Sequence, residues 1–185
     1  MTAEGTLILP AKSSYLDAYE QLADTWKKTQ EIQGKSLSIV LDTDLKTLPA
    51  KGPVWVIGFE NTFANRFEVQ RDYARYFNKQ QLKTINNLHK TGALVYAIPN
   101  PDNNGQTIGF VGANIKESIP GLARLLPHYG KYSWLGFEGS RPNNVLKGTF
   151  PPLHSPLHYN IPVKGQRPAI KARLKPEPPL TTLPR

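Results

Sequence analysis

Residues 6–41 read TLILPAKSSYLDAYEQLADTWKKTQEIQGKSLSIVL, and this stretch decides the fold. The apolar run at residues 6–9, closed by Pro10, predicts a short buried strand. Apolar residues then recur at spacings of three and four from Tyr15 to Trp26, which is the pattern of an amphipathic helix. Ser13 or Ser14 is expected to cap this helix, and Gly34 to end it. Residues 37–41 form the next apolar run, so the chain opens as strand, helix, strand.

The rest of the first 150 residues continues this alternation. Residues 54–57, 93–98, 107–111 and 132–137 read as strands, with 132–137 as the last one. The turn-rich residues 99–105 predict a hairpin between the second and third of these. A helix capped by Asn61 or Thr62 is expected to carry Phe63, Phe67, Tyr73 and Phe77, and a shorter one is expected at residues 118–126. The sequence therefore predicts a three-layer α/β domain over residues 1–150, with a mainly parallel sheet.

Composition sets the last 35 residues apart. The chain has 185 residues, 23 Lys and Arg against 14 Asp and Glu, and 17 prolines. Residues 151–185 alone hold nine of those prolines and six Lys or Arg against one Glu. They are interpreted as an extended Pro-rich basic tail. Because residues 164–175 contain no aromatic side chain to stack on bases, the charge does not indicate a nucleic-acid partner.

Several classes of protein are excluded by missing motifs. The sequence has no His-Glu-x-x-His, no Gly-x-Ser-x-Gly, no P-loop and no Gly-x-Gly-x-x-Gly. With no cysteine, it has no disulfide, thiolate metal site or cysteine nucleophile. No apolar run approaches the roughly 20 residues of a membrane-spanning helix. His154 and His158 are four residues apart, but Pro152 and Pro156 prevent the helix that would align them as metal ligands, so no metal site is expected in this chain.

The first candidate binding site is Gly58-Phe-Glu-Asn61, which follows a strand and precedes a predicted helix. In open α/β sheets such strand ends form the usual ligand crevice. We therefore assign Gly58, Glu60 and Asn61 as candidate ligand-binding residues, with Glu60 disfavouring a phosphate. A plain helix cap by Asn61 explains the same residues.

The second candidate is His128-Tyr-Gly-Lys-Tyr-Ser133, which places a titratable ring, two aromatics, a cation and a hydroxyl in six residues. His128, Tyr129 and Lys131 are candidate ligand-binding residues at the entrance to a strand. The alternative is a connector whose aromatics seal the sheet.

A small hydrolase or transferase is also conceivable, with Ser133 as nucleophile and His128 as base. Its orienting acid would be Glu60 or Glu138, and the three groups would have to meet within hydrogen-bonding distance. The tryptophans Trp26, Trp55 and Trp134 all fall on periodic apolar positions, so each is expected in the core.

Several segments together resemble a known family. Val54-Trp-Val-Ile-Gly-Phe-Glu-Asn61 and Tyr96-Ala-Ile-Pro-Asn-Pro-Asp102 with residues 108–112 are similar to a module found late in some bacterial exopeptidases. Residues 126–139, 144–150 and 155–157 resemble the closing segment of M1-type (gluzincin) aminopeptidase relatives.

The resemblance implies a C-terminal accessory domain of a bacterial zinc aminopeptidase, placed in the periplasm or cell envelope. Zinc and its ligands would belong to a separate upstream catalytic domain of the same polypeptide, which would be the partner of this chain. None of those ligands has a counterpart here, so no catalytic residue and no cofactor are carried over. The leading expectation is thus a non-catalytic accessory or interaction domain. The alternatives are a module that binds a small ligand or peptide, and the Ser133/His128 hydrolase.

Overall fold

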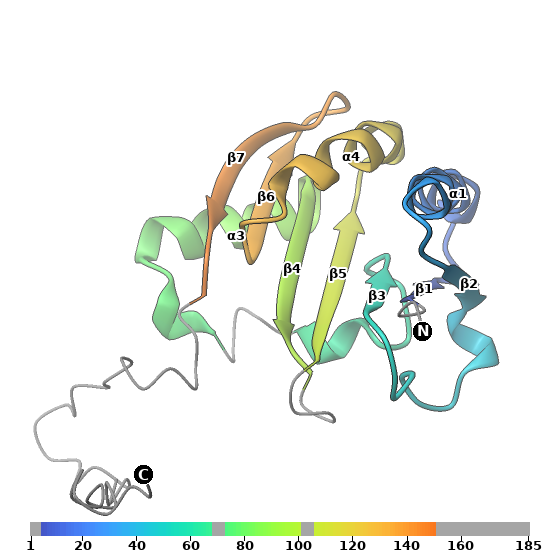
Figure 1. Ribbon diagram of the computed structural model, residues 1–185. Helices are drawn as coiled ribbons and strands as arrows, with labels where there is room; N and C mark the ends of the chain where they lie inside the picture. The colour runs from blue at the N-terminus through green and yellow to red at the C-terminus, as the bar shows by residue number, and fades with distance from the viewer. Residues whose placement is uncertain (1–4, 68–72, 101–105, 151–185) are drawn as a thin grey trace, which may run out of the picture. The chain divides into compact units, whose positions relative to one another are not determined.

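A computed structural model describes residues 5–67, 73–100 and 106–150 (Figure 1). The chain divides into two units, residues 1–150 and residues 151–185. The predicted tail, with His154 and His158, lies outside the described residues, as do residues 101–105 of the predicted hairpin turn.

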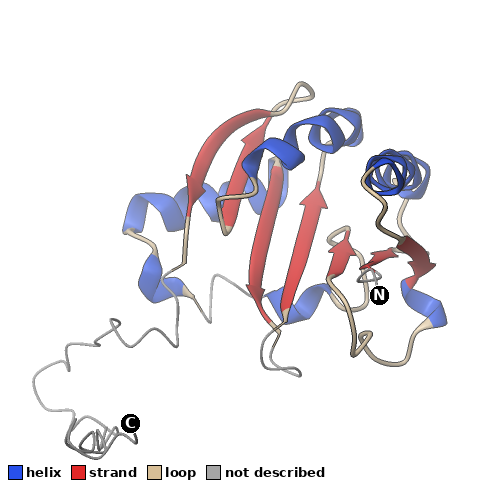
Figure 2. Ribbon diagram, viewed as in Figure 1, coloured by secondary structure: helices blue, strands red, loops and turns tan. Residues whose placement is uncertain are grey.

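A seven-stranded sheet with the order β2-β1-β3-β5-β4-β6-β7 forms the middle layer of the described part (Figure 2). The strands are β1 Gly5–Leu9, β2 Leu37–Leu41, β3 Val54–Ile57, β4 Ala93–Pro99, β5 Thr107–Ala113, β6 Trp134–Glu138 and β7 Asn143–Gly148. The helices are α1 Leu16–Ile32, α3 Lys79–Thr91 and α4 Ile119–Leu125. The predicted α/β class is confirmed.

The sheet is mixed, with a parallel half and an antiparallel half. β1 pairs in parallel with β2 and β3, and β3 pairs in parallel with β5. The β4–β5 pair is antiparallel, as predicted for a hairpin, and runs from Ala93 opposite Ala113 to Pro99 opposite Thr107. From β5 the chain crosses through α4 and passes over β4 to form β6, which therefore pairs antiparallel with β4. The predicted parallel arrangement thus describes β1, β2, β3 and β5.

Two elements differ from the sequence-based expectation. The segment after Asn61 forms short 3-10 turns, among them η2 Ala64–Phe67 and η3 Ala74–Tyr76, where a helix was expected. The helix in this region, α3, begins only at Lys79, beyond the last residue of the expected helix. It starts behind a capping box, in which Asn78 and Gln81 each accept a hydrogen bond from the other's backbone N–H. The strand at residues 132–137 is also not the last, because β7 pairs with β6 beyond it.

Two apolar cores lie on the two faces of the sheet. The first is between the sheet and α1 with α4, and it contains Tyr19, Leu22 and Phe137. The second is between the sheet and α3 with the 3-10 turns, and it contains Phe77 and Trp134. Together these layers give the three-layer arrangement (Figure 1).

The tryptophans do not all join these cores. Trp134 is buried, as expected. Trp26 and Trp55 are only partly buried and lie at the margin of the first core, so their assignment to the interior was wrong. Their partial exposure leads to the candidate site described below.

The second core contains one hydroxyl that should lower stability. Tyr96 is 3 % exposed, and its Oη has no hydrogen-bond partner among the described residues. Burial raises the pKa of this phenol well above its ordinary value. Because an unpaired buried hydroxyl carries a desolvation cost, Tyr96→Phe is expected to raise the free energy of unfolding by about 1 kcal/mol. Urea denaturation checks this, and a loss of about 1 kcal/mol or more would show that the hydroxyl has a partner.

Candidate functional site

The first predicted site lies at the carboxyl edge of the sheet, the edge at which β1, β2 and β3 end. Gly58 follows β3 with a φ of +90°, and its N–H donates to the carbonyl of Val111 (2.7 Å). A Cβ at Gly58 would come within 2.6 Å of Pro10 Cγ. Glycine is therefore required at this position by the turn and by its packing, which accounts for Gly58 without a ligand.

Asn61 anchors the same edge. It is 4 % exposed, and its Nδ2 donates to the carbonyls of Ile8 (2.9 Å) and Ile57 (3.0 Å). Its Oδ1 accepts from the N–H of Phe63 (3.0 Å), which agrees with the alternative interpretation of Asn61 as a local cap. All of these partners belong to the backbone, so the side chain ties β1 and β3 to the turn that follows.

Asp42 closes the rest of this edge. It is 3 % exposed, and its two carboxylate oxygens accept from the N–H groups of Ala11 (2.9 Å) and Thr62 (2.8 Å). Glu60, by contrast, is exposed. The polar groups of the usual α/β crevice are thus engaged in holding loops together, and this edge does not present Asn61 to a ligand.

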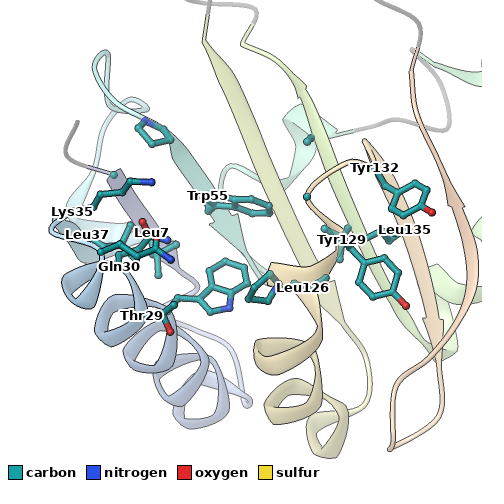
Figure 3. Close-up of a pocket in the computed structure, with 18 of the residues that line it drawn as sticks. Leu7, Thr29, Gln30, Lys35, Leu37, Trp55, Leu126, Tyr129, Tyr132 and Leu135 are labelled. Atoms are coloured by element: carbon teal, nitrogen blue, oxygen red, sulfur yellow. The ribbon is translucent and has the colours of Figure 1, made fainter. Parts of the chain in front are cut away.

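A pocket of about 600 Å³ opens at the other edge, where β1, β2 and β3 begin. It lies on the α1 side of the sheet, between the end of α1 and the turn η5 Leu126–Tyr129. We call it the amino-edge pocket. Figure 3 shows Lys35, Gln30 and Leu37 on one side of it, Tyr129 and Tyr132 on the other, and Trp55 between them.

Two tryptophans form one wall of the pocket. The rings of Trp26 and Trp55 meet edge to face, with centroids 5.3 Å apart and planes at 72°. Trp26 Nε1 donates to the carbonyl of Ala123 (3.0 Å), which fixes the ring from α1 against α4. The wall is therefore held from two elements and presents aromatic surface to the pocket.

Small residues of the sheet provide the space for these rings. Gly109 is the register partner of Trp55 on the neighbouring strand β5. A Cβ at Gly109 would overlap the Cδ2 and Cε3 atoms of the Trp55 indole, so the ring lies directly on the glycine backbone. Ala97, opposite Gly109 on β4, lines the pocket with a single methyl group. Larger side chains at these positions would displace Trp55 or fill the pocket.

Two tyrosines form the opposite wall. The rings of Tyr129 and Tyr132 lie 5.9 Å apart, and Tyr129 also meets the buried ring of Phe137 edge to face at 5.7 Å. This contact ties Tyr129 to the first core. Tyr132 is flanked by two cations, since Lys131 Nζ and Lys147 Nζ lie 5.4 Å and 5.7 Å from its ring centroid.

The charge on the lining of the amino-edge pocket comes from a single lysine. Lys35 is the one charged side chain among its lining residues in the described part of the chain, and none of those residues is acidic. The two lysines just described lie beside the Tyr132 ring but do not line the pocket. An anion near the mouth would therefore meet favourable potential.

The second predicted site is brought partly to this pocket. Tyr129 and Ser133 line it, whereas His128 and Lys131 are exposed and do not. The backbone of Ser133 is engaged on both sides, with its carbonyl accepting from Ala97 N–H and its N–H donating to Gly148 (both 2.8 Å).

The side chains expected for the hydrolase alternative, Ser133, His128 and an acid, do not come together in the structure. His128 is exposed, and the hydrogen bonds of Ser133 in the described structure join its backbone to Ala97 and Gly148 rather than its hydroxyl to His128. Glu138 ends β6 while Ser133 precedes its first residue, which separates them by roughly 16 Å along a strand. Glu60 follows β3 at the carboxyl edge. Neither acid can orient a base beside Ser133, so this set does not form a triad.

Among residues 5–67, 73–100 and 106–150, no three His, Asp or Glu side chains gather where they could hold a metal ion. Within the same residues, no helix combines the length and apolar character needed to cross a bilayer. Neither a protein-family model nor a curated protein sequence matches this chain significantly.

The sequence interpretation missed Trp26, Trp55, Lys35 and Tyr132 as site residues. For Trp55 the signal is its pairing with Gly109 on the adjacent strand. This pairing is not visible in the sequence, because it requires knowledge of the strand register.

Proposed function

We propose that this chain is a non-catalytic binding domain that holds a small ligand or a peptide end in the amino-edge pocket. The observation that carries the proposal is the pocket itself, with aromatic walls contributed by α1, β3 and the η5–β6 segment. Pockets of this volume with apolar walls and few polar groups are typical ligand sites.

We further propose that the domain serves as the C-terminal accessory domain of an M1-type aminopeptidase-like protein. Two of the segments that carry this resemblance border the pocket, because residues 54–61 contribute Trp55 and residues 126–139 contribute Tyr129 and Tyr132. In this role the pocket would help to shape access of substrates to the upstream catalytic domain.

The binding role is tested by a thermal-shift panel of short peptides and small organic molecules. A ligand at ten times its Kd is expected to stabilise the domain by about 1.4 kcal/mol, or roughly 3–5 °C for a domain of this size. The matched variant is Ala97→Leu, whose larger side chain is expected to project into the pocket beside Trp55 and obstruct the space between the walls. Circular dichroism establishes that this variant is folded.

A response that disappears in Ala97→Leu supports the proposal. A panel with no response, or with responses that Ala97→Leu leaves unchanged, contradicts it. Hydrolysis of aminoacyl-anilide substrates is assayed in parallel with and without zinc, and turnover abolished by a chelator would overturn the non-catalytic assignment.

A further inference from the structure

We infer that the amino-edge pocket selects an aromatic group that carries a carboxylate. This inference rests on the proposed binding function and names the chemistry of the ligand. Two independent features carry it: the flat aromatic walls and the cationic character of the mouth.

The walls favour a planar apolar group. Trp55 cannot retreat from the pocket, because its ring already lies against the backbone of Gly109. Trp26 is fixed by its hydrogen bond to Ala123, and Tyr129 by its contact with Phe137. Rigid aromatic faces bind another ring by offset or edge-to-face contact without first losing rotamer freedom.

The mouth favours an anion attached to that ring. Lys35 extends along one side of the pocket, where Figure 3 draws it near Gln30. Lys131 and Lys147 flank Tyr132 on the other side. A carboxylate in the pocket would meet the Lys35 ammonium and no acidic lining residue from the described part of the chain, while Lys131 and Lys147 lie beside the Tyr132 ring without lining the pocket.

Aromatic walls can also form a cage for an organic cation, and the positive charges near these walls disfavour this alternative. A cage binds a cation through free ring faces, and a neighbouring positive charge weakens that attraction. Here Lys131 and Lys147 already lie within 6 Å of the Tyr132 ring, and Lys35 adds a third cation. A cationic ligand in the pocket would be repelled by Lys35, and the Tyr132 ring already has two cations beside it.

An aromatic carboxylate can come from a free acid or from the C-terminal residue of a peptide. The experiment therefore uses both sources as matched pairs. Phenylacetate is compared with phenylacetamide and phenethylammonium, and the peptide acetyl-Gly-Phe is compared with its C-terminal amide. At pH 7 the carboxylates of these probes are ionised.

Binding is measured by isothermal calorimetry on the full chain and on two charge variants. Lys35→Gln removes the lining cation, and Lys28→Gln is its control, because Lys28 is an exposed residue of α1 that does not line the pocket. Each anion is expected to bind about fivefold more tightly than its neutral amide, and the cation more weakly than either. Lys35→Gln should reduce the preference for the anion to about twofold or less while leaving the affinity for the amide unchanged, and Lys28→Gln should change neither.

If the free acid binds and acetyl-Gly-Phe does not, the source is a small acid; if the peptide binds more tightly than the free acid, the source is a peptide C-terminus. Equal affinity for acid and amide would overturn the inference and leave the binding function in place. A preference for the anion that is unchanged in Lys35→Gln would also overturn the inference and leave the binding function in place. If no aromatic probe binds while another ligand of the thermal-shift panel does, the inference alone fails. If nothing binds, both fail.

Discussion

Asn61→Ala is expected to lower the free energy of unfolding by about 4 kcal/mol. The substitution removes two donated hydrogen bonds, to the carbonyls of Ile8 and Ile57, and one accepted from the N–H of Phe63. All three partners are backbone groups in a buried setting, and each left unpaired costs about 1–3 kcal/mol. Since a domain is typically stable by only about 5–15 kcal/mol, the loss would be a large part of the total.

Urea denaturation followed by circular dichroism measures this loss. Asn86→Ala is the matched control, because Asn86 is an exposed residue of α3, and its stability should change by less than about 0.5 kcal/mol. Asn61→Ala should leave the affinity for the pocket ligand unchanged under conditions in which the variant is folded. If Asn61→Ala instead leaves the stability unchanged and abolishes ligand binding, the ligand site lies at the carboxyl edge of the sheet.

Trp55→Ala is expected to weaken binding of an aromatic ligand by about 30-fold, since truncating a central aromatic anchor commonly costs 2 kcal/mol or more. The indole supplies the middle of the aromatic wall and supports Trp26 through their edge-to-face contact. Trp55→Phe should lose less, because a smaller ring retains a flat face. Isothermal calorimetry with phenylacetate gives the three affinities.

A variant that leaves the indole in place separates wall geometry from ring chemistry. Gly109→Ala places a methyl group where the Trp55 ring lies, so the ring must move. We expect weaker binding than in the wild type even though every side chain of the wall is present. If Trp55→Ala and Gly109→Ala both bind phenylacetate like the wild type, Trp55 is not part of the ligand site.

The fold could be predicted where each element carries its own periodic signal. The spacing of Leu16, Tyr19 and Leu22 identified α1, and the apolar runs identified β1, β2 and β3 with little error. β7 was missed as a strand because its residues alternate between exposed and half-buried at a sheet edge, which leaves little apolar signal. α3 was missed although Asn78 and Gln81 form a capping box at its start. The spacing of the aromatic residues before it resembled that of a helix, so the helix was expected there instead.

The candidate site could be predicted only in part, for a different physical reason. Gly58 and Asn61 stand where α/β proteins commonly bind ligands, yet their backbone partners come from β1 and β5, whose proximity only the fold reveals. The pocket arises because Trp55 on β3 faces Gly109 on β5, and residues so far apart in sequence show no such pairing before the strands are in register. Tyr129 was found because its aromatic and cationic neighbours are adjacent in sequence.

The central claim is that ligands enter at the amino edge of the sheet, and an NMR titration of the ¹⁵N-labelled chain with phenylacetate tests it most directly. The chain has three tryptophans, so its indole Nε1–H signals report on Trp26, Trp55 and Trp134 separately. The signals of Trp26 and Trp55 are expected to shift together and saturate at one Kd. Trp134 also lines the pocket, but its ring packs against Phe77 in the second core, on the other face of the sheet, so its indole signal should shift less than those of Trp26 and Trp55. Shifts confined to the backbone amides of Gly58 and Asn61, with all three indoles unmoved, would contradict the claim.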